Sequence, residues 1–224
     1  MRLLLFFLSA FPLSLLGQES SFILPKIVEV RVDDGIKFTL QQGEENAVFS
    51  DSNTIDLFHF KVKDSTLTIS KKSSNSSLKG DYSAFTLVVN KDLKYLILRS
   101  NVICSVLNEL DIQELAIDVF EGSSIRGRFI VDNFGIYMSN GSDAELNGVI
   151  DVFRGTFNNN SVCYARDLIV DDCEINATTG SEVKISVNSY LDVTTSLGAL
   201  VLYYGNPSTK NIQDRLGGQT LGKS

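Results

Sequence analysis

A repeat of about 20 residues covers much of this 224-residue chain and constrains its fold more than any other feature. A small or turn-forming residue recurs in steps of 22, 19, 19, 20 and 18 residues, the differences between successive positions Ser100, Gly122, Gly141, Asn160, Gly180 and Gly198. Repetition at this period is typical of a solenoid, because one repeat is a single unit that must stack on its neighbours to bury its apolar face.

Apolar residues recur at fixed even offsets around this marker. Five residues before it the column is Tyr95, Ile117, Ile136, Gly155, Ile175 and Val193. Three residues before the marker the column is Ile97, Val119, Met138, Phe157, Ala177 and Thr195. Three residues after the marker it is Ile103, Ile125, Ala144, Cys163, Val183 and Val201. Alternation with period two on both sides of a turn predicts a strand, a tight bend and another strand.

These columns predict an all-β fold, a parallel β-helix of about six rungs over residues 93–208, with like residues stacked about 4.8 Å apart. An antiparallel sandwich of short strands is the alternative. A sandwich has no reason to repeat its register at several offsets, so the β-helix is favoured.

Residues 1–17 have the features of a secretory signal peptide. Arg2 provides the charge, residues 3–16 are apolar apart from Pro12 and two serines, and Gly17 is a small residue suited to cleavage. The apolar stretch is too short to span a bilayer comfortably, and no later stretch is long enough. We therefore expect the mature chain to be exported and to have no membrane span.

Two regions flank the repeat. Within residues 18–92, alternating apolar residues surround Asp33-Asp34-Gly35 and again Lys63-Asp64-Ser65, which predicts two β-hairpins that form the first coils or a cap of the same body. Residues 71–80 are rich in Ser, Lys and Asn and are expected to form an exposed loop. The polar tail 209–224 leaves open whether it adds a strand or is disordered.

Composition and residue types exclude several kinds of site. The net charge of −7 and the absence of basic runs argue against a nucleic-acid partner. The only histidine, His59, alternates with Phe58 and Phe60 and should face solvent, so neither a zinc site nor a Ser-His-Asp triad is indicated. No cofactor or metal is expected. Asp171 shares a column with Asp151, and a solvated face explains this pair better than a calcium site.

Three cysteines leave at least one thiol unpaired. Cys163 and Cys173 fall in interior columns, which favours two small buried hydrophobes, although an exported protein could also join them in a disulfide. Cys104 follows Ile103, an interior position, and is therefore expected to point outward as a free thiol.

Three stretches carry a family resemblance: residues 62–69 (Val-Lys-Asp-Ser-Thr-Leu-Thr-Ile), 85–106 and 176–207. The last contains Thr179-Gly180-Ser181-Glu182-Val183 and the ending Tyr203-Tyr204-Gly205-Asn206-Pro207. In their order and spacing these stretches resemble a bacterial family of putative auto-transporter adhesins with a head GIN domain. The resemblance implies an exported β-helical protein and brings no catalytic residues. The pattern is degraded at Asn158–Ser161 and Ser196–Ala199, where we expect distorted turns.

These features favour an exported, non-enzymatic β-helix that presents a binding or adhesive surface to a glycan or to an envelope or host-surface protein. The proposed face is an outward column made of Asp118, Tyr137, Thr156, Asn176 and Thr194. One alternative is a structural or sensing partner in the periplasm. A carbohydrate-active enzyme is disfavoured, because Trp is absent and Arg126, Arg128 and Arg154 have no evident carboxylate cluster beside them.

Overall fold

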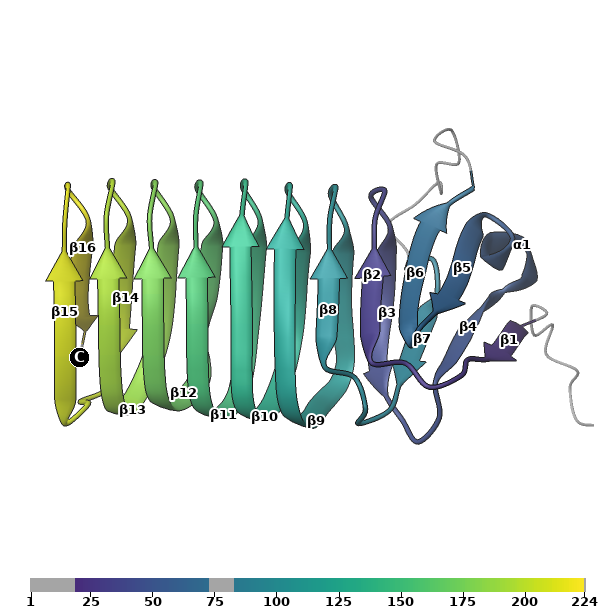
Figure 1. Cartoon of the computed structure of the whole chain (residues 1–224), viewed down its shortest axis with the longest axis horizontal. Coiled ribbons are helices and arrows are strands. Elements are labelled where there is room, and N and C mark those ends of the chain that lie inside the picture. The colour runs from purple at the N-terminus through teal and green to yellow at the C-terminus, as the bar shows by residue number, and fades with distance from the viewer. Residues whose placement is uncertain (1–18, 73–82, 224) are drawn as a thin grey trace, which may run out of the picture.

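The computed structural model describes residues 19–72 and 83–223, so the expected signal peptide (residues 1–17) and most of the loop expected at 71–80 lie outside the described residues. The described chain forms one elongated body made almost entirely of strands (Figure 1). In chain order the elements are β1 (Glu19–Ile23), β2 (Glu29–Val32), β3 (Lys37–Gln42), β4 (Ala47–Asp51), α1 (Ser52–Ile55), β5 (Phe58–Lys63), β6 (Thr66–Lys71), β7 (Thr86–Val89), β8 (Tyr95–Leu98), β9 (Ile103–Phe120), β10 (Ser124–Ser139), β11 (Asp143–Phe157), β12 (Val162–Ala177), β13 (Glu182–Thr195), β14 (Leu200–Tyr204), β15 (Thr209–Asp214) and β16 (Gln219–Lys223).

The long strands β9 to β13 confirm the predicted parallel β-helix. Each begins after a tight corner, runs along one face, bends, and returns along the other face to the next corner (Figure 1). Neighbouring strands pair in parallel, as in Ile136 beside Ile117 and Gly155. The coil makes about seven turns, close to the six rungs predicted.

The corners follow one pattern. Two successive residues have positive φ, as in the type I′ turn, for example Glu121 (56°) and Gly122 (70°). The corners also stack, because the Gly122 N–H donates to the Asn140 carbonyl 3.1 Å away and the Gly141 N–H donates to Asn159 at 3.0 Å. Gly and Asn suit these positions since they tolerate the left-handed region.

The two turns expected to be distorted are regular, so that prediction was wrong. Asn159 and Asn160 have φ values of 51° and 58°, and Leu197 and Gly198 have values of 51° and 76°. Both turns also keep the hydrogen bond from the fourth residue to the first, at 3.2 Å and 3.1 Å. The backbone geometry therefore survives changes of sequence because stacking on neighbouring corners fixes it.

Stacked apolar side chains fill the interior. The rings of Phe134 and Phe153 stack with centroids 5.7 Å apart. Gly155 occupies an interior position between larger residues, and a Cβ there would lie 2.4 Å from the ring of Phe157 and 2.8 Å from that of Phe153. Gly155 is therefore the residue that fits in this apolar column, because the rings of Phe153 and Phe157 occupy the space that a larger side chain would need.

The register of the first predicted rung was wrong by one residue. Leu96 and Leu98 are fully buried and pair with Ile117 and Val119, while Tyr95 and Ile103 are exposed. The cause is the corner, which uses Ser100 and Asn101 as its two positive-φ residues and so aligns Asn101, not Ser100, with Gly122. A one-residue shift exchanges inward and outward side chains along both strands.

This shift also corrects the cysteine prediction. Cys104 is fully buried beside Ile125 instead of pointing outward. Cys163 and Cys173 are buried as predicted, and all three thiols are free, with no disulfide between Cys163 and Cys173. Burial raises the pKa of each thiol far above its ordinary value, to about 12 for Cys163, so the thiols should be unreactive while the protein is folded.

The first predicted hairpin is a coil. β2 pairs in parallel with β6 and β8, and β3 pairs in parallel with β7 and β9, so the two strands lie on opposite faces around the corner Asp34-Gly35. The Gly35 N–H donates to the Ser100 carbonyl at 2.7 Å, which stacks this corner on the next one. The second hairpin is confirmed, because β5 pairs antiparallel with β6.

Antiparallel strands cover the N-terminal end of the coil. β4 pairs with β1 and β7, and β5 pairs with β6, so the chain leaves the first coil, forms this cover and returns to β8 (Figure 1). Phe85 lies at its centre, with ring centroids 5.5 Å from Phe38, 5.5 Å from Phe58 and 5.3 Å from Phe60.

At the other end, the tail adds a further coil. β15 pairs with β13 and β16 pairs with β14, both in parallel. Polar residues occupy interior positions in this coil, with Lys210 beside Leu191, Asp214 beside Thr195 and Thr220 beside Val201. Asp214 accepts hydrogen bonds from the Thr195 and Thr220 hydroxyls at 2.6 Å and 2.7 Å. Ile212, beside Val193, is an apolar residue in this coil, so the core ends in a mostly polar layer whose hydrogen bonds centre on Asp214.

Candidate functional site

The predicted outward column is continuous. Tyr137 pairs with Asp118 on one side and Thr156 on the other, Thr156 pairs with Asn176, and Asn176 pairs with Thr194. The five side chains therefore lie in one row across β9 to β13, spaced about 4.8 Å apart. None is fully buried.

Tyr137 is held in place by its neighbours. The ring centroids of Tyr137 and Phe120 are 5.4 Å apart. The guanidinium of Arg99 lies 5.1 Å from the centroid of the Phe120 ring. The Asn158 side-chain amide donates to the Tyr137 hydroxyl at 3.1 Å. The tyrosine is 38% exposed, so the column presents a fixed aromatic surface to solvent.

Asp118 begins the row in a less polar setting. Burial raises the pKa of its carboxyl above the ordinary value, and the Glu29 carboxylate adds to this increase, whereas Arg99 lowers the pKa. The row thus combines a partly buried acid, a tyrosine and three neutral hydrogen-bonding side chains, which can contact a polar ligand without strong charge.

Two shallow grooves lie beside the column. One, of about 400 Å³, is lined by Thr156 and Asn176 of the column together with Arg154 and Glu174. The Arg154 guanidinium pairs with the Glu174 carboxylate at 3.3 Å. The second groove, of about 210 Å³, is lined by the small residues Ala116 and Gly135 together with larger ones that include Tyr95. Ala116 and Gly135 leave this groove open because their side chains are smaller than those of the residues around them.

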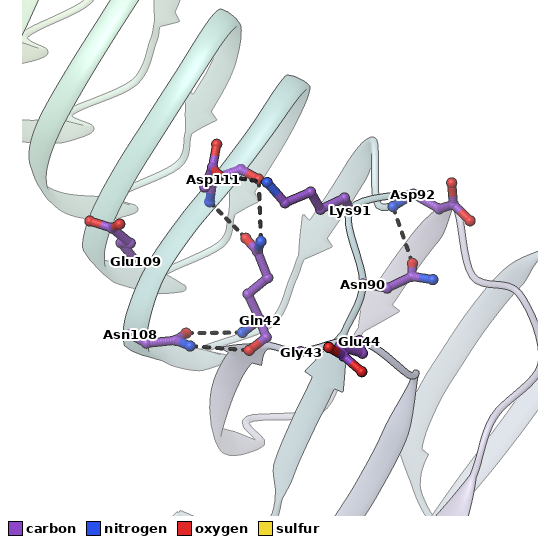
Figure 2. A pocket seen from close by; sticks show the side chains of 9 residues that line it. All are labelled: Gln42, Gly43, Glu44, Asn90, Lys91, Asp92, Asn108, Glu109 and Asp111. Carbon is purple, nitrogen blue, oxygen red and sulfur yellow. Dashed lines mark hydrogen bonds and ion pairs between the residues drawn. The ribbon is translucent and has the colours of Figure 1, made fainter.

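A third hollow, of about 630 Å³, lies where the first coil meets β9 (Figure 2). Gln42 occupies its centre. The Gln42 N–H donates to the Asn108 side-chain oxygen at 2.9 Å, and the Asp111 N–H donates to the Gln42 side-chain oxygen at 2.7 Å. Lys91 pairs with Asp111 at 2.5 Å. Most of these polar atoms satisfy one another, so the hollow is a clamp between β3 and β9 more than an open binding site.

The residues considered from sequence for catalysis or metal binding lie on separate parts of the coil. His59 is exposed on the hairpin as predicted. Arg128 and Arg154 each pair with one carboxylate, Glu109 and Glu174. Asp171 lies beside Asp151, as the pairs on either side of them show. Across residues 19–72 and 83–223, no group of three or more His, Cys, Asp or Glu side chains is arranged to hold a metal.

Comparison with known families decides the relationship. The profile of the family described as "Putative auto-transporter adhesin, head GIN domain" matches residues 28–207. This chain belongs to the head GIN domain family. No helix in the described part of this family member is both long and apolar enough to cross a bilayer. A search of curated proteins found no match.

Solved structures share the fold of this head GIN domain protein. A "putative adhesin" from Bacteroides fragilis has a TM-score of 0.74 at 12% identity, covering 92% of this chain and 96% of that one. A "putative adhesin" from Parabacteroides merdae has a TM-score of 0.64 at 13% identity, covering 93% and 97%. A "putative lipid binding protein" from Parabacteroides distasonis has a TM-score of 0.58 at 16% identity, covering 93% and 98%. Identities this low show a common fold only.

Sequence reasoning placed the column but missed the features around it. The grooves depend on Tyr95 and on the Arg154–Glu174 pair, which connects adjacent coils. The register gives a usable signal, because Arg154 and Glu174 occupy the same outward column on successive rungs. Tyr95 was assigned to the interior, so the shifted first rung hid it.

Proposed function

We propose that this head GIN domain protein is an exported, non-enzymatic adhesin or envelope binding module. Its binding surface is the outward column with the two grooves beside it. The single observation that carries the proposal is the uninterrupted row from Asp118 to Thr194, with Tyr137 fixed by Phe120 and Asn158. A glycan or an extended protein surface can follow such a row from coil to coil.

Three observations support this proposal. The family is described as an adhesin family. The first 17 residues have the composition of an export signal. The carboxylates nearest Arg154 are already engaged within the protein, Glu174 with Arg154 at 3.3 Å and Asp192 with the Asn211 side-chain amide at 3.0 Å, which supports a binding role over a hydrolytic one.

Cell fractionation and a binding screen test the proposal together. In intact cells, protease should cut the protein while a periplasmic marker survives, as expected for a surface adhesin. Protection until the outer membrane is opened would instead favour the periplasmic structural or sensing alternative. Release of reducing or unsaturated sugars from any polysaccharide in a broad panel would overturn the non-enzymatic assignment.

The binding screen uses glycan arrays and host-matrix proteins, followed by variants. Tyr137→Ala should weaken binding to any ligand found by roughly tenfold, the usual cost of losing a central aromatic contact. The matched control is Tyr164→Ala, which removes an exposed tyrosine from the opposite face of the coil. Equal affinity of the Tyr137→Ala variant and the wild-type protein would reject the column as the binding surface.

A further inference from the structure

A basic cleft lies at the C-terminal end of the coil, away from the outward column. It has a volume of about 840 Å³ and its lining includes Arg166, Lys210, Lys223, Tyr203 and Tyr204. Among the described residues, Asp167 is the only acidic side chain in the lining. Three cations against one carboxylate give this cleft a positive balance in a chain whose net charge is −7.

The cleft arises where the interior columns end. Tyr203 continues the column of Ile185, and the next residue in that column is Gly222. A Cβ on Gly222 would lie 2.8 Å from the Tyr203 ring and hydroxyl, so the glycine makes room for this side chain. From the opposite face, Lys210 takes the interior position after Leu191. The last coil thus directs a lysine and a tyrosine into space that apolar residues fill elsewhere.

The cations of the cleft form no ion pair with the part of the protein that the structure describes. Within residues 19–72 and 83–223, Arg166, Lys210 and Lys223 have no ion pair, whereas Arg128, Arg154 and Lys94 elsewhere on the coil each have one. The guanidinium of Arg166 lies 4.6 Å from the Tyr204 ring centre, and the Lys210 ammonium lies 6.0 Å from that of Tyr203. Aromatic contact orients a cation and leaves its N–H groups free to donate.

We infer that this cleft binds an acidic saccharide, a chain of sugars carrying carboxylate or sulfate groups. Arg166, Lys210 and Lys223 would pair with the anionic groups, since charge-assisted hydrogen bonds to such oxygens are strong. Tyr203 and Tyr204, which are only partly exposed, would contact sugar rings at the edge of the cleft. The cleft is open and its lining combines three cations with the hydrogen-bonding side chains of Ser186 and Asn206, which suits a hydrated acidic sugar chain better than an acyl chain.

The experiment is titration calorimetry on the purified protein with three oligosaccharides of equal length. One carries carboxylates (oligogalacturonate), one carries sulfates (a sulfated galactan) and one is neutral (a galactan). Binding to an acidic ligand only, weakening at higher salt, is expected. The two acidic arms distinguish carboxylate from sulfate. Equal binding to the neutral ligand, no binding to either acidic one, or binding only to phosphatidylglycerol vesicles would overturn the inference.

Variants locate the site. Arg166→Gln and Lys210→Gln should each weaken acidic binding by roughly tenfold, the cost of one charged hydrogen bond. The matched control is Lys63→Gln, another exposed lysine with no ion pair in the described part of the chain, at the opposite end of the coil. An equal loss in Lys63→Gln would mean that net charge, and not the cleft, attracts the ligand. Since these side chains are exposed, circular dichroism should confirm unchanged folding.

This site does not depend on the proposed function. Tyr137→Ala should leave acidic binding unchanged, and Lys210→Gln should leave binding at the outward column unchanged. The two ideas can therefore fail separately.

Discussion

The two ends of the coil are closed in different ways. At the N-terminal end, extra strands pair antiparallel with the body and cover it with a cluster of phenylalanines around Phe85. At the C-terminal end, the outermost strands β15 and β16 are exposed along nearly their whole length. There the core ends because Lys210, Asp214 and Thr220 replace apolar residues in the interior columns.

The difference shows two physical solutions to one problem. A stack of apolar layers must end without exposing its last layer or inviting another chain to pair with its edge. Covering the end buries aromatic surface and adds stability, whereas a polar last layer adds little burial and leaves its edge accessible. We therefore expect the N-terminal end to be the more stable one and the C-terminal end to open first.

Removing the central ring of the N-terminal cover should have the largest effect. Phe85 is 2% exposed, so Phe85→Ala should lower the free energy of unfolding by about 3–5 kcal/mol. Ile212→Ala at the C-terminal end is the comparison, and because Ile212 is 39% exposed its cost should be about 0.5 kcal/mol. Urea denaturation measures both. Similar losses of unfolding free energy in the two variants would contradict the expectation that the N-terminal end is the more stable one.

Relieving backbone strain should strengthen the C-terminal half. Leu197 adopts φ of 51°, in a region where a side chain costs about 1–2 kcal/mol and where asparagine is better tolerated. Leu197→Asn should therefore raise the free energy of unfolding by about 1 kcal/mol. Leu107→Asn is the control, because Leu107 is also exposed and has no positive φ. The same gain in both variants would mean that replacing an exposed leucine with a polar side chain, and not relief of backbone strain, causes the stabilisation.

The smallest expected effect is that of acid, which should destabilise the C-terminal coil before the rest of the protein. Desolvation, the largest single influence, raises the pKa of Asp214, but the hydrogen bonds from Thr195 and Thr220 outweigh it and leave the pKa below the ordinary value of 3.8. A carboxyl group whose pKa is lowered by folding stabilises the fold fully above its unfolded pKa and loses that contribution as pH falls through the folded pKa. The stability of β15 and β16 should therefore decline as the pH falls below the ordinary aspartate pKa of 3.8.

Hydrogen exchange of peptides from residues 209–223 measures this opening. Asp214→Asn should exchange faster in this region at neutral pH and should remove most of the acid dependence. The control is Asp132→Asn, an exposed aspartate in the middle of the coil. Unchanged exchange in Asp214→Asn would mean that the hydrogen bonds to the two threonines do not hold the last coil.

Much of the middle of the coil follows from sequence, because alternation and the corner residues repeat from rung to rung. The register failed at the first rung, where Ser100 and Asn101 are both turn formers and sequence alone does not choose between them. The corner Asp34-Gly35 was mistaken for a hairpin, because the same two-residue turn serves both structures and only distant pairing distinguishes them. The last coil was left undecided, because its mostly polar interior interrupts the apolar period.

Prediction of the candidate site is limited in the same way, because local patterns do not show which distant residues meet. Alternation alone places the outward column, since register fixes which side chains face solvent. The clamp around Gln42 depends on hydrogen bonds between residues 66 and 69 positions apart, which local patterns do not encode. The basic cleft depends on Lys210 and Tyr203 meeting from opposite faces of the coil.

The parallel pairing of β9 to β13 has a mechanical consequence. Hydrogen bonds between strands point along the long axis of the coil, whereas the covalent backbone winds across it (Figure 1). Tension along the axis would pull neighbouring coils apart one hydrogen-bonded pair at a time. Tension applied along a strand would load a whole ladder in shear. A partner attached to the outward column and one attached to the C-terminal edge would therefore pull against different resistances in the same molecule.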